Sequence, residues 1–283
     1  MKARSPDELF LRLAEASPIG IYVIERGCFR YLNPQFSITT GFSGDELLGR
    51  HCLTLVQDED RARVRQSAID MLQNRCREPY EYRVQCKDGS TRWILETVAS
   101  VEYKGRVVVG NFMDITERKA AENALLEKAR RDPLTRLLNH GAFLEELYDS
   151  ISTNARVKHW LIMADVVGLK RINDVHGHQV GDVVLRKVAA VMDRPGTVVG
   201  RYGGDEFAAL LVGGTREKAV TYCETVTEIL SQTMLADFRN RSPLMPRITM
   251  GIAGYPDDAI SVTALIRASD EALLNLRSLT LAA

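Results

Sequence analysis

The stretch Gly203-Gly204-Asp205-Glu206-Phe207 joins two strand-like runs, residues 198–202 and 208–212, and decides how the second half of the chain folds. Paired glycines between two strands are typical of the primed turns of a β-hairpin, whose central residues need positive φ. Glycines also leave no side chain in the way of a phosphate group. We therefore predict a tight hairpin that holds Asp205 and Glu206 beside an open space.

A short apolar run, His159 to Ala164, lies upstream and ends at Asp165. Its length and composition predict a buried strand. Carboxylates on neighbouring strands, such as Asp165 and Asp205, are what Mg²⁺ takes from a protein when phosphates and water complete its octahedron. If a nucleoside triphosphate binds together with the metal, such a pair of carboxylates can support in-line displacement at phosphorus, and Lys170 can hold a phosphate oxygen.

Five segments in the second half of the chain, taken in order, resemble the GGDEF domain of diguanylate cyclases. They are residues 131–139, 165–182, 203–207, 248–253 and 269–273. That family joins two GTP molecules into cyclic di-GMP with release of pyrophosphate. The resemblance covers roughly residues 130–277, and it implies a nucleotidyl-cyclase-like α/β domain with a mostly antiparallel sheet.

The resemblance also implies roles for individual residues. Asp165, Asp205 and Glu206, with the backbone carbonyl of Val166, would hold Mg²⁺ or Mn²⁺, and Asp205 and Lys170 would be catalytic. The residues that would bind the substrate GTP are Asn173, His178, Asp182, Gly203, Gly204 and Arg277. An amide and a carboxylate can complement the O6 acceptor and the N1 and N2 donors of guanine, so GTP is favoured over ATP.

Other interpretations of these residues stay open. Asn173 and Asp182 also suit a turn and the first turn of a helix, and Lys170 suits an exposed helix face. His176 and His178 flank a glycine, but two histidines in a turn with no nearby cysteine make a poor zinc site.

The chain departs from the GGDEF pattern at several positions. Val167 stands where the family usually carries a second acid, and Arg136 replaces a usual glycine. Near the C-terminus, Arg277 stands where the family has a lysine and Leu281 where it has an arginine. A lost cation near a triphosphate weakens binding. The alternative function is therefore a catalytically weak or inactive GGDEF module that binds GTP or a partner and relays a signal.

The family's product-inhibition element, Arg-x-x-Asp, is incomplete. Here the segment reads Arg194-Pro195-Gly196-Thr197, so the arginine is kept and the acid is lost. We favour an ordinary turn at this position and expect no product inhibition through it.

The first part of the chain has a different pattern, with strand-like runs at residues 19–24, 28–32, 81–86, 91–98 and 106–113. With helical segments between the first and second pairs, this order resembles a PAS sensor domain, an antiparallel sheet with flanking helices, over residues 8–117. PAS domains hold haem, flavin, an apolar small molecule or nothing. His51 is the only histidine in the region and is a weak candidate for a haem ligand, so the PAS ligand is unknown.

Residues 115–131 contain no proline or glycine and are rich in good helix formers, which predicts one continuous helix. We therefore expect a PAS domain at 8–117, a helical linker at 118–131 and a GGDEF domain at 132–283, an α+β and α/β two-domain chain joined by a signalling helix. Ala121, Leu125 and Lys128 form a narrow stripe that can pair as a coiled coil in a homodimer. A solvated linker helix is the alternative.

Composition sets the remaining expectations. The chain has 37 Lys+Arg and 37 Asp+Glu, so its net charge of zero argues against binding to a nucleic acid polymer or an anionic membrane. No run approaches the roughly 18 apolar residues of a membrane span, and the N-terminus lacks the apolar core of a signal peptide. The 5 scattered cysteines fit reduced thiols. We expect a cytoplasmic protein, and a phosphodiesterase domain behind Ala283 stays an open possibility.

Overall fold

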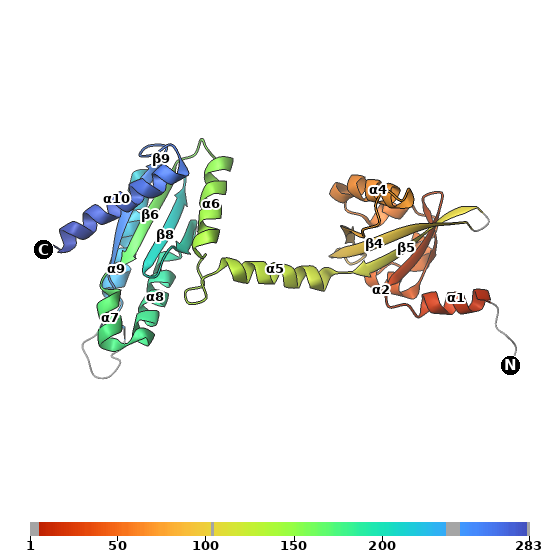
Figure 1. The fold of residues 1–283 in the computed structure, drawn as a ribbon, viewed down its shortest axis with the longest axis horizontal. Helices are drawn as coiled ribbons and strands as arrows, with labels where there is room; N and C mark the ends of the chain where they lie inside the picture. The colour runs from red at the N-terminus through yellow and green to blue at the C-terminus, as the bar shows by residue number, and fades with distance from the viewer. Residues whose placement is uncertain (1–5, 103–104, 236–243, 282–283) are drawn as a thin grey trace. The chain divides into compact units, whose positions relative to one another are not determined.

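The computed structural model describes residues 6–102, 105–235 and 244–281. Contacts divide the chain into two compact units, Met1–Leu125 and Leu126–Ala283, and each is described by itself (Figure 1). Within the described ranges, no helix combines the length and the apolar composition needed to cross a membrane.

The first unit is built on a five-stranded antiparallel sheet in the order β2-β1-β5-β4-β3. The strands are β1 Gly20–Glu25, β2 Cys28–Leu32, β3 Tyr80–Gln85, β4 Thr91–Glu102 and β5 Arg106–Asp114. All five predicted strands are present, and β4 continues past its predicted end at Val98. Inward residues alternate with outward ones along β3 and β4, as expected for a sheet with one covered face.

Helices lie beside this sheet, and their ends follow from local capping. They are α1 Pro6–Glu15, α2 Pro34–Thr40, α3 Gly44–Leu47, the 3₁₀ helix η1 Cys52–Leu55 and α4 Asp58–Leu72. The buried side chain of Asn33 starts α2, since its Oδ1 accepts from Phe36 N at 3.0 Å and also from Ile21 N at 2.8 Å. One amide therefore fixes α2 against β1.

Helix α5, Thr116–Arg130, is the continuous helix that the composition predicted. In its first turn, Lys119 Nζ lies 2.6 Å from Glu81 Oε2 on β3, and Arg118 pairs with the same carboxylate. In its last turn, Arg130 lies 2.7 Å from Glu146 of the second unit. The middle of α5 buries no residue.

The second unit has a four-stranded antiparallel sheet in the order β7-β8-β6-β9. Its strands are β6 His159–Val166, β7 Thr197–Arg201, β8 Glu206–Val212 and β9 Ile248–Tyr255. Its helices are α6 His140–Thr153, α7 Leu169–His176, α8 His178–Met192, α9 Arg216–Gln232 and α10 Val262–Leu281. The antiparallel sheet and flanking helices confirm the predicted fold class.

The strand β6 is buried on both faces, which explains its unbroken apolar sequence. Trp160 and Ile162 pack into a core that includes residues of α8 and α9, whereas Leu161 and Met163 pack into a core with residues of α6 and α10. The unit is therefore three layers deep, with the sheet in the middle.

Helix α10 lies very close to β9. A Cβ atom built on Gly251 would lie 2.2 Å from the backbone N of Leu273 and 2.5 Å from the carbonyl oxygen of Ser269. Only glycine allows this approach. It fixes where the following turn of α10, which carries Arg277, meets the end of β6.

Candidate active site

Asp165 is the next-to-last residue of β6 and is 2% exposed. Because side chains alternate along a strand, it shares a face with Leu161 and Met163, the face that α10 covers. Arg277 reaches it from α10, with Nη2 2.6 Å from Oδ1 and 2.9 Å from Oδ2. Burial raises the pKa of Asp165 to about 6, Arg277 opposes this, and the charges of Asp205 and Glu206 add to the rise.

The hairpin that carries Asp205 and Glu206 differs from its prediction. Strand β7 ends at Arg201 and β8 begins at Glu206, so the connection is longer than two residues. The carbonyl of Glu206 accepts from the backbone N of Tyr202 at 2.8 Å and of Gly203 at 3.1 Å. Neither glycine of the turn has a positive φ. The predicted two-residue primed turn is therefore wrong.

The two glycines serve different purposes. A Cβ atom on Gly203 would lie 2.5 Å from Oε2 of Glu206, so a side chain there would collide with that carboxylate. A Cβ atom on Gly204 would meet nothing within 4 Å. The turn thus borders open space, and the Asp205 carbonyl accepts from Val166 N at 3.1 Å, which ties the turn to the end of β6.

An arginine at the end of β7 holds the turn in place. The Arg201 guanidinium donates to the Gly204 carbonyl at 2.6 Å and to both carboxylate oxygens of Asp132 at 3.2 Å. Asp132 also accepts from the backbone N and Oγ1 of Thr135, each at 2.7 Å. Burial raises the pKa of Asp132, but the bonds from Thr135 and Arg201 outweigh it and leave that pKa below its ordinary value. The entrance segment of the unit therefore supports the hairpin.

Helices α7 and α8 carry four of the predicted site residues. Lys170 and Asn173 are three residues apart on α7, and His178 and Asp182 are four apart on α8, so each pair shares a helix face. Lys170 and His178 are exposed, and Asn173 and Asp182 are half-buried. The interpretation of Lys170 as a residue on an exposed helix face therefore agrees with its position.

Asn173 has an unsatisfied acceptor. Its Oδ1 atom is buried and has no hydrogen-bond partner within the described part of the chain. A Cβ atom on Gly181 would lie 1.9 Å from the same oxygen, so the amide lies directly against α8. Buried acceptors without partners are rare in folded proteins because they are costly. The described residues leave this oxygen without a donor.

The simpler interpretations of Asn173 and Asp182 do not match their positions. Asn173 is the fifth residue of α7, in the helix and not in a turn. Asp182 is the fifth residue of α8, beyond the first turn, where a carboxylate would interact with the helix dipole.

The acidic residues at the end of β6 and the start of β8 suit a divalent cation that is bound together with a ligand. Across residues 6–102, 105–235 and 244–281, no three His, Cys, Asp or Glu side chains gather into an all-protein metal site. A Mg²⁺ ion bound with phosphates needs only one or two carboxylates. Burial is the main cause of the raised pKa of Asp165, and the negative charges of Asp205 and Glu206 add to it, so a cation bound beside them would favour the ionised form.

The structure shows what surrounds the chain at two positions where it departs from the family pattern. The predicted phosphate ligand Arg277 instead pairs with Asp165, and the side chain of Leu281 lies outside the described residues. The Arg194 carbonyl accepts from Thr197 N at 3.2 Å, and Gly196 has a φ of 78°. With Pro195 ahead of that glycine, these features are those of a type II turn. The sequence favoured an ordinary turn here without specifying its type.

Sequence reasoning missed Arg201 and Gly181 as site residues. A glycine inside a helix costs about 1 kcal/mol relative to alanine, so Gly181 carried a signal that something approaches it closely. Arg201 carried none, because its partner Asp132 is 69 residues away in the chain.

Comparisons with known proteins show the family of each part of the chain. The family model described as "Diguanylate cyclase, GGDEF domain" matches residues 129–279, and the model described as "PAS fold" matches residues 29–110. Diguanylate cyclase DgcM of Escherichia coli K12 is 28% identical over 212 residues, which cover 71% of this chain and 49% of that relative. An uncharacterized signaling protein of Caulobacter vibrioides is 29% identical over 279 residues, 96% of this chain and 34% of the relative.

Solved structures show the same likeness. The coiled coil and GGDEF domain of DgcB from Caulobacter crescentus, in complex with c-di-GMP, has a TM-score of 0.54 at 25% identity and covers 58% of this chain and 88% of that one. Diguanylate cyclase SiaD from Pseudomonas aeruginosa, in complex with its activator SiaC, has a TM-score of 0.51 at 27% identity, with 57% and 63% covered. The chain spans less than half of the length of the two curated relatives described above. The matched residues, the antiparallel sheet and the acidic hairpin together show that the chain belongs to the GGDEF family of diguanylate cyclases, with a PAS-fold domain ahead of the GGDEF domain.

Proposed function

We propose that the chain is a diguanylate cyclase that condenses two GTP molecules into cyclic di-GMP and two pyrophosphates under the control of its PAS domain. The observation that carries this proposal is the acidic cluster where β6 ends and β8 begins. There, buried Asp165 is paired in register with Glu206, beside the glycine turn that carries Asp205. The turn borders open space, as a triphosphate requires. The cytoplasm, which supplies GTP, is the proposed location.

The guanine base is assigned to the helix pair α7 and α8, which carries Asn173 and Asp182. The unpartnered Oδ1 of Asn173 accepts an N–H of guanine, and Asp182 takes the neighbouring donor. His178 contacts the same nucleotide. This assignment favours guanine because adenine carries an acceptor at N1, where guanine carries a donor.

The triphosphate lies between the end of β6 and the start of α7. The first N–H groups of a helix have no partner inside the helix and bind phosphate readily. Lys170, exposed in the first turn of α7, adds a positive charge there. Asp165, Asp205, Glu206 and the Val166 carbonyl would hold Mg²⁺ or Mn²⁺, which supplies charge neutralisation at the phosphates when bound.

The reaction is an in-line displacement. Asp205 accepts the proton of the attacking 3′-hydroxyl, an O–P bond forms at the α-phosphorus of the second GTP, and the bond to the bridging oxygen of its β-phosphate breaks. Pyrophosphate leaves, and Lys170 stabilises the charge that develops. A second displacement in the opposite direction closes the ring.

One domain binds one GTP in this proposal, so two chains must meet as a homodimer. Leu125 and Leu126 of α5 are 66% and 63% exposed, which supports pairing through this helix. Catalysis then depends on how two GGDEF domains are oriented. The ion pairs of Lys119 with Glu81 and of Arg130 with Glu146 attach the two ends of α5 to the PAS and GGDEF units.

A second candidate function is a weak or inactive GGDEF module that binds GTP or a partner and relays the PAS signal. The ion pair between Arg277 and Asp165 favours it, because the arginine engages a carboxylate that the catalytic proposal assigns to a metal.

Incubation of the purified chain with GTP and Mg²⁺, followed by chromatographic separation of the nucleotides, tests the proposal. We expect cyclic di-GMP from the wild type and none from Asp205→Asn, which removes the charge but keeps the shape. Asp149→Asn, the same change at an exposed position of α6, is the matched control and should leave product formation unchanged. Unreacted GTP in the wild-type sample, with GTP binding still measurable by calorimetry, would refute the enzyme and favour the second candidate.

A further inference from the structure

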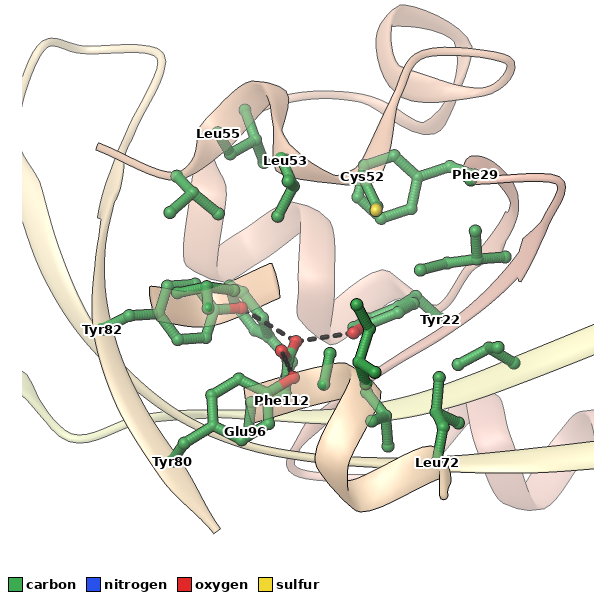
Figure 2. Close-up of a pocket in the computed structure, with 18 of the residues that line it drawn as sticks. Tyr22, Phe29, Cys52, Leu53, Leu55, Leu72, Tyr80, Tyr82, Glu96 and Phe112 are labelled. Atoms are coloured by element: carbon green, nitrogen blue, oxygen red, sulfur yellow. Dashed lines mark hydrogen bonds between the residues drawn. The ribbon is translucent and has the colours of Figure 1, made fainter. Parts of the chain in front are cut away.

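The PAS unit contains a partly open cavity of about 420 Å³ between its sheet and its helices. This volume lies in the range of sites that bind small organic molecules. Most of the wall is apolar, with side chains such as Phe29, Leu53, Leu55, Leu72 and Phe112. A single acidic residue, Glu96 of β4, also lines it, and Figure 2 shows it among the surrounding tyrosines.

Three phenol groups converge on the carboxylate of Glu96. Tyr22 donates to Oε1 at 2.6 Å, Tyr82 to Oε1 at 2.8 Å and Tyr80 to Oε2 at 2.5 Å. Glu96 is 4% exposed, and each tyrosine is buried as well. An ionised carboxylate offers about four acceptor positions. The tyrosines take three of them, so the carboxylate can accept one further hydrogen bond.

No protein cation balances the charge of Glu96. Within the described part of the chain, none of the ion pairs includes Glu96. Arg26 and Arg106 line the cavity, but both are exposed, and Arg106 Nε donates to Ser100 Oγ at 2.8 Å. Cys52 is the remaining titratable group in the wall, and burial, with the charge of Glu96 second, raises its pKa to about 11, which keeps it neutral.

Burial raises the pKa of Glu96, and the three phenols only partly offset this rise. Burial therefore favours the neutral form of this carboxyl when nothing else occupies the pocket. An anionic ligand would disfavour ionisation further. A ligand with an ammonium group would stabilise the ionised carboxylate and donate a hydrogen bond to it.

We propose that this cavity binds a small organic cation, an amine attached to an apolar group, whose N–H donates to Glu96 while its apolar part lies among the aromatic and aliphatic side chains of the wall. The same site disfavours carboxylates and phosphates. The proposal is independent of cyclase activity, because it concerns binding to the PAS unit alone.

Three probes that share an apolar body and differ in charge test the proposal on the full chain: phenethylamine, 2-phenylethanol and 3-phenylpropionate. Binding is measured by calorimetry and by the shift in melting temperature. We expect phenethylamine to bind at least about tenfold more tightly than the alcohol, a difference of about 1.4 kcal/mol, because a hydrogen bond to a charged group is stronger than a neutral one. The propionate should not bind.

Two variants separate charge from folding. Glu96→Gln keeps the size of the side chain and removes the charge, so it should abolish the preference for the amine and leave binding of the alcohol unchanged. Glu102→Gln, an exposed position on the same strand, is the matched control. If Glu96→Gln fails to fold, Tyr82→Phe serves instead, since it keeps the carboxylate and frees a second acceptor position, and should retain the amine preference.

Equal binding of amine and alcohol, tighter binding of the propionate, or an amine preference that survives in Glu96→Gln would each overturn the proposal. Failure of phenethylamine to bind at millimolar concentration would also overturn it and leave the four side chains as a network that only stabilises the fold.

Discussion

Replacement of Gly181 with alanine tests how the site would recognise guanine without changing any group that contacts the nucleotide. The added methyl group would lie 1.9 Å from Asn173 Oδ1, whereas real Cβ atoms essentially never approach another heavy atom within 3.0 Å. The amide must therefore move by about 1 Å or more. Such a displacement breaks a hydrogen bond whose useful distances span only a few tenths of an ångström.

The expected loss is that of one neutral hydrogen bond. At about 0.5–1.5 kcal/mol, GTP affinity should fall by about two- to thirteenfold. The fold should survive the change, because alanine inside a helix is about 1 kcal/mol more favourable than glycine, which offsets part of the steric cost.

A double-mutant cycle shows whether the effect acts through Asn173. Affinity for a non-hydrolysable GTP analogue is measured by calorimetry for Gly181→Ala, Asn173→Ala and the double variant. In the Asn173→Ala background, Gly181→Ala should cost nothing further, because the clashing oxygen is gone. Gly141→Ala is the matched control, since its methyl group would meet only Asn139 Oδ1, at an ordinary 3.7 Å. An unchanged affinity in Gly181→Ala, or an equal loss in both backgrounds, would refute the assignment of Asn173 to the base.

Two further predictions concern stability and assembly. The hydrogen bonds from Arg83 lower the pKa of the buried Asp60 from 3.8 to about 2, so the ionised carboxylate contributes about 2 kcal/mol to the free energy of unfolding above pH 4, and this contribution is lost as the pH falls through 2. In urea unfolding, the free energy of unfolding should therefore fall more steeply with acid in the wild type than in Asp60→Asn. Parallel pH dependences of the two proteins would contradict this. Leu125→Asp should weaken the proposed dimer, measured by gel filtration, and should lower the specific activity on dilution, measured by turnover assays. Leu126→Asp, about 100° around the helix, should have a smaller effect on both. Full activity of a strictly monomeric wild type would count against pairing.

The elements of the fold could be predicted because their patterns are local. The apolar run at residues 159–164 predicts a buried strand from length and composition alone, and the structure extends it only to Val166. The hairpin turn failed for a physical reason. Paired glycines suggest positive φ, but this turn is set by Arg201, which holds the Gly204 carbonyl, and by the Glu206 side chain, which needs the space at Gly203.

Contacts between residues far apart in the chain could not be predicted in the same way. Arg277 meets Asp165 across 112 residues because Gly251 lets α10 lie close on β9, and no local pattern encodes that approach. Glu96 did leave a signal, since it alternates with Ile94 and Val98 on the buried face of β4. An acid in the inward register of a strand indicates a partner, but the sequence alone does not say that the partners are three tyrosines.

Asp165 and Glu96 are both buried carboxylates, and they differ in how the chain compensates them, which separates their proposed roles. Asp165 already forms an ion pair with Arg277 of its own chain. A metal bound at the end of β6 must therefore share the carboxylate with Arg277 or displace the arginine, so metal binding there competes with an internal ion pair. Glu96 accepts hydrogen bonds from three neutral phenols and forms no ion pair with any residue that the structure describes. Burial raises the pKa of Glu96 and so favours its neutral form. An incoming ammonium would stabilise the ionised form of Glu96 without having to displace a resident cation, whereas a cation at Asp165 competes with Arg277.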